Sequence, residues 1–162
     1  MSNSKLDNII KYHENLLDCG KKITIVRGLK TKEILNRLIE IEEGIVRFSI
    51  RREYDNKEFG DDYKRIMKQM PFIVKTLRKD NFSRQAVISH WDPEILQCIT
   101  QLQFIVRCDK IHLFSTLRSS DVTGKLKNDI IFLSHILNYV SKKTNIKLGG
   151  MTIHIISMHK YI

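Results

Sequence analysis

One segment near the C-terminal end, residues 125–141, constrains the fold more than any other. Its apolar residues nearly fill every face of a helix: Ile130, Ile131, Leu133, Ile136, Leu137 and Val140. A helix that is apolar on most of its faces has to be covered by other elements instead of water. The segment therefore predicts a buried helix inside a layered fold.

The runs on either side of this segment predict a sheet that can cover it. Four runs are rich in β-branched and aromatic residues: 85–91, 95–108, 110–119 and 151–159. A short turn at Asp109-Lys110 joins the second and third runs as a hairpin. Gly149-Gly150 precedes the last run. We expect most of the sheet to come from this half of the chain.

The first half of the chain predicts shorter elements. Helical spacing of apolar residues indicates helices at 4–18, 32–42, 63–67 and, with Pro71 in its first turn, 72–79. Short β-branched runs indicate strands at 22–26 and 45–50, and the polar residues from 52 to 62 indicate a loop. We find no repeat or interdomain linker. The chain thus predicts one α+β domain over residues 1–162, with a mixed sheet and helices packed on one side.

The formal net charge of +10 on 162 residues has two readings, a lysine-rich solvated surface or an anionic partner. The basic residues are spread along the chain without the interleaved aromatic residues that stack on single-stranded bases, so we do not expect nucleic acid binding. A small phosphorylated ligand would suit the charge equally well.

Two further features bear on location and metal binding. No apolar run reaches the roughly 18 to 20 residues that cross a bilayer, and the N-terminal segment is amphipathic and unlike a signal peptide. We therefore expect a cytoplasmic protein that does not bind membranes. Cys19, Cys98 and Cys108 form no CxxC pair, which predicts free thiols and no metal site.

A set of polar residues in the second half has a distinctive spacing. Cys98 lies in an apolar run, Arg118-Ser119 is followed by Asp121, and His159 and Tyr161 form an HxY pair. Taken singly, each has an ordinary explanation, since a cysteine in a strand is most often a small buried apolar residue. The combination carries more information than its members.

Together, these residues resemble the pattern of the thymidylate synthase family. The segment DNFSRQAVISHW, with Ser83-Arg84, resembles the SRR segment that this family places before a strand ending in tryptophan. The segment TKEIL resembles its HELL helix start and puts Glu33 at the general-base position. The resemblance implies the fold of that family and a pyrimidine nucleotide pocket.

Asp129 bears on which branch of the family the chain resembles. Thymidylate synthases have asparagine eleven residues after the arginine of the RSxD motif, whereas phage deoxycytidylate hydroxymethylases have aspartate, and here that position is Asp129. An amide can pair with O4 and N3-H of uracil, but a carboxyl group accepts from the cytosine 4-amino group and, when protonated, donates to N3. Asp129 thus favours dCMP over dUMP. A slip of one residue would instead place Asn128 in the pocket and restore uracil.

The resemblance implies a catalytic role for three residues. Cys98 adds to C6 of the base, Glu33 organises water and proton transfer, and Asp121 orients the pterin of 5,10-methylenetetrahydrofolate, the one-carbon donor. A hydroxymethylase then adds water to the transferred carbon, and a synthase adds hydride.

The resemblance also implies how the nucleotide is bound. Arg118 favours the thiolate of Cys98 and, with Ser119, holds the 5′-phosphate, while His159 and Tyr161 fix the 3′-hydroxyl. Arg84 reaches the phosphate from the other subunit, which implies a homodimer formed through the sheet.

Several positions depart from the family pattern, mostly on the cofactor side. Gln85 replaces the second arginine of SRR, Ile99 follows the cysteine, and no tryptophan lies between Arg47 and Tyr63. The chain ends one residue after Tyr161, where relatives continue into a segment that closes the folate site. Three hypotheses remain: a small deoxycytidylate hydroxymethylase of viral or phage type, a protein that binds the nucleotide without folate chemistry, or a dUMP-directed thymidylate synthase-like enzyme.

Overall fold

The computed structural model describes residues 2–19, 23–26, 28–54, 56–94 and 97–162. Six strands form a single sheet in the order β1-β2-β6-β5-β4-β3. Their bounds are β1 Ile23–Val26, β2 Leu29–Ile41, β3 Val87–Ser89, β4 Ile99–Arg107, β5 Lys110–Asp121 and β6 Lys147–Tyr161. Only β5 and β6 pair in parallel among the described strands, so the sheet is mixed, as the sequence predicts.

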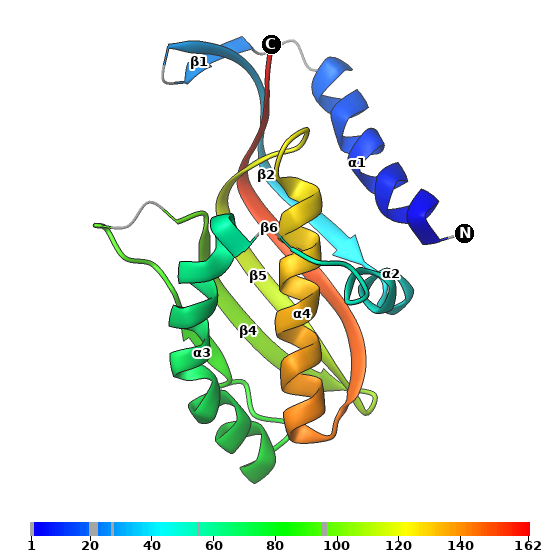
Figure 1. The fold of residues 1–162 in the computed structure, drawn as a ribbon, viewed down its shortest axis with the longest axis vertical. Coiled ribbons are helices and arrows are strands. Elements are labelled where there is room, and N and C mark those ends of the chain that lie inside the picture. Colours follow the sequence, from blue (N-terminus) through cyan, green and yellow to red (C-terminus); the bar gives the residue numbers. More distant parts are fainter. Residues whose placement is uncertain (1, 20–22, 27, 55, 95–96) are drawn as a thin grey trace.

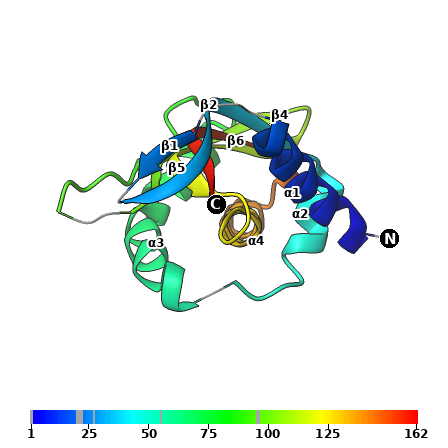
Figure 2. The same cartoon turned by 90° about the horizontal axis from the view of Figure 1, so that it is seen from above.

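Four helices cover one side of this sheet (Figures 1 and 2). They are α1 Ser2–Cys19, α2 Glu43–Ser49, α3 Asn56–Lys79 and α4 Leu126–Thr144. The α4 helix lies against the middle of the sheet, with α3 on one flank and α1 and α2 on the other. The predicted α+β fold with helices on one side is confirmed. None of the described helices has an apolar stretch long enough to span a membrane.

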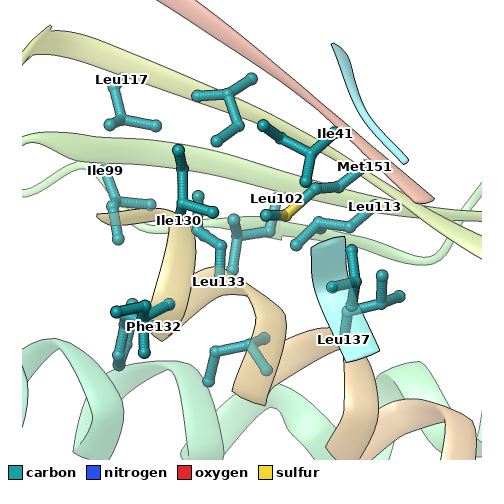
Figure 3. Close-up of a cluster of buried hydrophobic side chains, with 14 of the residues drawn as sticks. Ile41, Ile99, Leu102, Leu113, Leu117, Ile130, Phe132, Leu133, Leu137 and Met151 are labelled. Carbon is teal, nitrogen blue, oxygen red and sulfur yellow. The ribbon is translucent and has the colours of Figure 1, made fainter. Parts of the chain in front are cut away.

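The core lies between α4 and the sheet. Figure 3 shows Leu102, Leu113 and Met151 of the strands facing Leu133 and Leu137 of the helix, and all five are buried. Apolar residues on nearly every face of α4 are buried in this way, which confirms the predicted buried helix. Because β5, α4 and β6 form one crossover between parallel strands, this helix fixes how the ends of both strands meet.

The first of three errors in the prediction concerns residues 32–42, which form most of strand β2 and not a helix. Residues of β2 pair with β6 from Thr31↔Tyr161 to Ile41↔Met151. Ile39 and Ile41 face the core on alternate positions. Long antiparallel pairing therefore overrides the helical spacing of the apolar residues.

Residues 45–50 are the second error, because they lie mainly in helix α2 and not in a strand. Glu43 and Arg47 form an ion pair one turn apart, with 2.8 Å between their atoms. Ile45, Val46 and Ser49 form the buried face of this short helix. The apolar residues of a six-residue run fit a helix face as well as a strand.

The third error is that the sequence predicts a loop and two short helices where the structure has a single helix. Helix α3 runs unbroken from Asn56 through Pro71 to Lys79. Its buried residues follow one continuous stripe: Phe59, Ile66, Met70, Ile73 and Leu77. Packing along this stripe outweighs the backbone hydrogen bond that Pro71 cannot donate.

Two glycines sit inside strand β6, not before it. A Cβ atom on Gly149 would lie 2.6 Å from the carbonyl oxygen of Ile111, and one on Gly150 would lie 2.6 Å from that of Ile41. These glycines let the strand approach its two neighbours closely. The remaining strand predictions hold, but Lys22 and residues 95 and 96 lie outside the described residues.

Candidate active site

Two adjoining cavities lie where β5 and β6 end. The larger measures ≈ 450 Å³, and its walls include seven of the nine predicted site residues: Glu33, Cys98, Arg118, Ser119, Asp121, His159 and Tyr161. The smaller measures ≈ 100 Å³ and includes Asp129. Cys98, Ser119 and Lys125 line both cavities. The thiol of Cys98 therefore lies at their junction.

Strand pairing explains how distant parts of the sequence meet here. The parallel strands β5 and β6 align Asp121 with His159 and Ser119 with Ser157. Strand β4 runs the other way, so its first residues meet the last residues of β5, and the amide of Arg118 donates to the carbonyl of Cys98 at 2.8 Å. Ligand sites commonly form at the carboxyl ends of parallel strands joined by a helix.

Cys98 is half-buried, and hydrogen bonds hold the segment around it. Its Sγ lies 3.7 Å from Ser119 Oγ. The preceding Gln97 accepts from Arg65 at its side-chain oxygen (2.9 Å) and from Arg118 Nε at its carbonyl (2.8 Å). Gln97 also donates to the carbonyl of His90. These bonds fix the segment that carries the thiol.

His90 links this segment to helix α3. It is buried, and its Nε2 lies 2.7 Å from Asp62 Oδ1. Asp62 also lines the smaller cavity. The contact joins the end of β3 to the helix that forms one wall of the site.

Asp129 lies almost completely buried at the start of α4, with 3% of its surface exposed. Ser120 Oγ donates to its Oδ2 at 2.6 Å. Burial raises the pKa of Asp129 to about 7, against the lowering effect of the Ser120 hydrogen bond. Asp129, and not Asn128, lines the smaller cavity beside Cys98. This carboxyl group can hold a proton near neutral pH.

The expected helical setting of Glu33 is wrong, because Glu33 lies in strand β2 opposite His159. Its side chain still lines the larger cavity, where Oε1 accepts a hydrogen bond from Ser157 Oγ. The HELL-like start that suggested a general base is therefore absent, although a carboxylate does reach the cavity.

The other predicted residues divide into those that face the cavity and one that does not. The rings of His159 and Tyr161 lie edge to face with 5.2 Å between their centres. Asp121 Oδ1 accepts from the amide (3.0 Å) and hydroxyl (2.8 Å) of Thr123, which shapes the turn into α4. Arg84 is exposed before β3 and lines neither cavity.

Three charged residues of the site were missed from the sequence: Glu58, Asp62 and Lys125. Lys125 lines both cavities and pairs with Glu58 of α3, with 2.9 Å between Nζ and Oε1. Lys125 lies inside the RSSDVTGKLKND string, so its proximity to Arg118 and Asp129 offered a signal. Glu58 gave none, because it lies in a polar stretch interpreted as a loop.

This arrangement has the chemistry of nucleophilic addition to a small polar ring. A partly accessible thiol lies between a protonatable carboxyl group and a set of cationic and hydroxyl groups. The larger cavity adds the guanidinium group of Arg118, the hydroxyl group of Ser119 and the rings of His159 and Tyr161, all of which can form hydrogen bonds.

Comparison with known proteins agrees with this chemistry. The thymidylate synthase family model matches residues 46–162, and the chain belongs to this family. Members of the family transfer one-carbon units with methylenetetrahydrofolate, bind pyrimidine nucleoside monophosphates and are usually dimeric. The match begins after Glu33, whose general-base role therefore gains nothing from it.

Individual relatives are distant. A “Putative thymidylate synthase” of Methanocaldococcus jannaschii is 26% identical over 82% of this chain and 77% of the relative. Another of the same name from Methanosarcina barkeri is 26% identical over 95% of this chain and 82% of the relative. The crystal structure of thymidylate synthase from T4 phage superposes with a TM-score of 0.73 at 15% identity, covering 95% of this chain and 76% of that one. The superposition establishes the shared fold.

Proposed function

We propose that this protein transfers a one-carbon unit from 5,10-methylenetetrahydrofolate to C5 of dCMP, as a deoxycytidylate hydroxymethyltransferase. The observation that carries the proposal is Asp129, a buried carboxyl group in the cavity that also holds Cys98. With its pKa raised to about 7 by burial, it can donate to N3 of cytosine and accept from the 4-amino group. An ionised surface carboxylate could only accept.

The residues of the chain supply the first chemical steps. C5 of a pyrimidine is a weak nucleophile until C6 is saturated, and Cys98 at the junction of the cavities is placed to add to C6. Arg118 and Ser119 hold the phosphate in the larger cavity, and His159 with Tyr161 holds the sugar. Glu33, fixed by Ser157, orders water beside them.

The folate fits the donor set on one side of the larger cavity. Asp121 lines this cavity, and its carboxylate oxygens suit the N–H donors of a pterin ring. When bound, the folate supplies a one-carbon unit at the oxidation level of formaldehyde. Asp121 has the role of orienting it.

The deciding experiment is tritium release from 5-tritiated dCMP and dUMP, measured with and without methylenetetrahydrofolate. We expect release from dCMP that requires the folate. No release from either nucleotide, combined with calorimetric binding of dCMP, would instead identify a nucleotide-binding protein without folate chemistry.

Asp129→Asn is expected to shift base preference toward dUMP. In the orientation that pairs with O4 and N3-H of uracil, an amide places its NH2 against the 4-amino group of cytosine and its carbonyl oxygen against N3. Donor then faces donor and acceptor faces acceptor, and an unpaired buried polar group costs about 1–3 kcal/mol. The ratio of kcat/KM for dCMP over dUMP should therefore fall about 10- to 100-fold. Competition between the two labelled nucleotides measures this ratio.

Asn128→Ala is the matched control, since Asn128 does not line the smaller cavity. It should leave the ratio unchanged. A ratio that responds to Asn128→Ala and not to Asp129→Asn would mean that the wrong residue of the pair has been assigned to the base.

A second candidate function is a dUMP-directed thymidylate synthase. The archaeal relatives carry that name, and a protonated carboxyl group can also donate to O4 of uracil while accepting from N3-H. The hydrogen bond from Ser120 engages one oxygen of Asp129 with either base and does not distinguish the two substrates. The tritium experiment separates the two substrates.

The active unit that we propose is a homodimer of single 1–162 domains, joined through the helix-free face of the sheet. Leu38, Phe114 and Ile156 alternate with buried residues of their strands and are 61%, 43% and 44% exposed. Apolar side chains on one open face are typical of a subunit interface. In such a dimer, Arg84 would enter the phosphate site of the partner.

Subunit mixing tests this arrangement. Arg84→Ala and Cys98→Ser should each give inactive homodimers, but co-expression should restore about one quarter of wild-type activity, because each mixed isologous dimer contains one complete site. Activity that stays absent in isolated mixed dimers would show that Arg84 does not act across the interface.

A further inference from the structure

The proposed function leaves open which cation favours the thiolate of Cys98. A thiolate is the nucleophilic form of cysteine, and a neighbouring cation stabilises it. The resemblance to the family suggested Arg118. In this protein Arg118 Nε is engaged in holding the carbonyl of Gln97, with 2.8 Å between the atoms. A second cation, Lys125, lines both cavities with Cys98.

Lys125 is fixed at this position by its own contacts. Its ammonium group pairs with Glu58 Oε1 at 2.9 Å, and Glu58 lines the smaller cavity together with Cys98. The amide of Lys125 donates to the carbonyl of Asp121 at 2.8 Å, in the turn that begins α4. Both ends of the residue are thus held against the site, although its side chain is half exposed.

The charge on Cys98 acts directly on the ammonium group of Lys125. The hydrogen bond from Lys125 to Glu58 raises the pKa of Lys125, burial opposes this, and negative charge on Glu58, Cys98 and Asp129 adds to the increase. The raised pKa favours the charged form of Lys125, and this ammonium group lines the same two cavities as the thiol.

We propose that Lys125, held by Glu58, is the cation that stabilises the thiolate of Cys98 and sets its reactivity. This rests on the proposed role of Cys98 as the nucleophile. Lys125 acts on the thiol and makes no bond to the substrate in this step. It is therefore a positioning residue, whose charge favours the thiolate. The proton of the thiol passes to water.

Other charged groups also face the thiol and contribute to its pH response. They come from β2, α3, β5, α4 and β6: Glu33, Glu58, Asp62, Arg118, Asp129 and His159. All of them remain when Lys125 alone is replaced. Replacing Lys125 also leaves Glu58 without this partner, so a comparison of variants at position 125 reports the loss of the Lys125–Glu58 pair beside the thiol.

The test measures the rate at which iodoacetamide alkylates Cys98 from pH 5 to pH 10. Cys19 and Cys108 are exposed, so both are first replaced by serine to leave one thiol. Iodoacetamide is uncharged, so its approach to the thiol does not itself depend on the charges around the site. Lys125→Met should move the midpoint of the rate profile upward by about one unit, which slows alkylation at pH 7 about tenfold.

Two further variants complete the test. Lys125→Arg keeps the cation and should retain the wild-type midpoint. Lys127→Met removes a lysine from the same turn, where it pairs with Asp7 on the surface, and should leave the profile unchanged. Equal alkylation rates in urea would confirm that the thiol itself is unaltered.

The proposal is overturned if Lys125→Met and Lys127→Met give the same midpoint while both proteins melt at the wild-type temperature. Should Lys125→Met fail to fold, Lys125→Gln gives the same comparison with a polar side chain. Because alkylation needs neither nucleotide nor folate, this result is independent of the tritium experiment. A shifted alkylation midpoint in a protein that releases no tritium would support the role of Lys125 and reject the proposed enzymatic activity.

Discussion

Cys98→Ser is expected to abolish tritium release from 5-tritiated dCMP. The hydroxyl of serine is far less acidic than a thiol, so it offers almost no anionic nucleophile for C6 near neutral pH. Loss of a covalent nucleophile lowers turnover by on the order of 10⁴-fold or more. The measurement is initial tritium release at saturating dCMP and methylenetetrahydrofolate.

The control for this variant is Cys108→Ser. Cys108 is exposed in the turn between β4 and β5, away from both cavities, and should be dispensable. Calorimetry should show that Cys98→Ser still binds dCMP, because the phosphate and base contacts come from other residues. Substantial release by Cys98→Ser would rule out addition of this thiol to C6.

The sheet and its buried helix could be predicted because their signals are local. Residues 110–119 are rich in residues that favour strands, and the apolar residues of α4 cover nearly every face. At these lengths, each pattern is typical of one kind of secondary structure. The hairpin itself was predicted, but its turn lies one residue earlier than expected. Cys108 and Asp109 form the turn in the left-handed conformation, and Lys110 already pairs with Arg107.

The first half could not be predicted in the same way, because its elements depend on partners elsewhere in the chain. Strand β2 has apolar residues that fit a helix, and only its pairing with β6, over one hundred residues away, selects the strand. Helix α2 is too short for its period to be decisive. Such segments follow tertiary packing more than their own propensity.

The site residues also divide into those that lie in a recognisable sequence pattern and those that only the fold brings to the site. The resemblance supplied Cys98, Arg118, Ser119 and Asp129 because they lie in two continuous strings of sequence. Glu58 comes from a separate helix and touches the site only through the packing of α3 against α4. Sequence reasoning supplied the cysteine that we propose as the nucleophile, together with Arg118 and Asp129, but it could not identify Glu58 beside them.

Replacing Asp129 by asparagine is also expected to change how stability depends on pH. The native pKa is raised from 3.8 to about 7, mainly by burial, with Ser120 opposing. Between these values the folded protein retains a proton that the unfolded chain releases. Stability from this group is therefore greatest below the unfolded pKa and declines as pH rises toward 7.

Asparagine cannot ionise, so the variant should escape this decline. Relative to wild type, the free energy of unfolding of Asp129→Asn should rise by about 2–3 kcal/mol between pH 5 and pH 8. Urea unfolding at both pH values measures the difference. Titration of the histidines occurs in both proteins and cancels.

Asp61→Asn provides the matched control, since Asp61 is 82% exposed and pairs only loosely with Lys64 at 3.5 Å. Its unfolding free energy should follow wild type at both pH values. Parallel curves for Asp129→Asn and wild type would mean that Asp129 is ionised throughout this range. It could then not donate to N3 of cytosine, and the preference for dCMP would lose its physical basis.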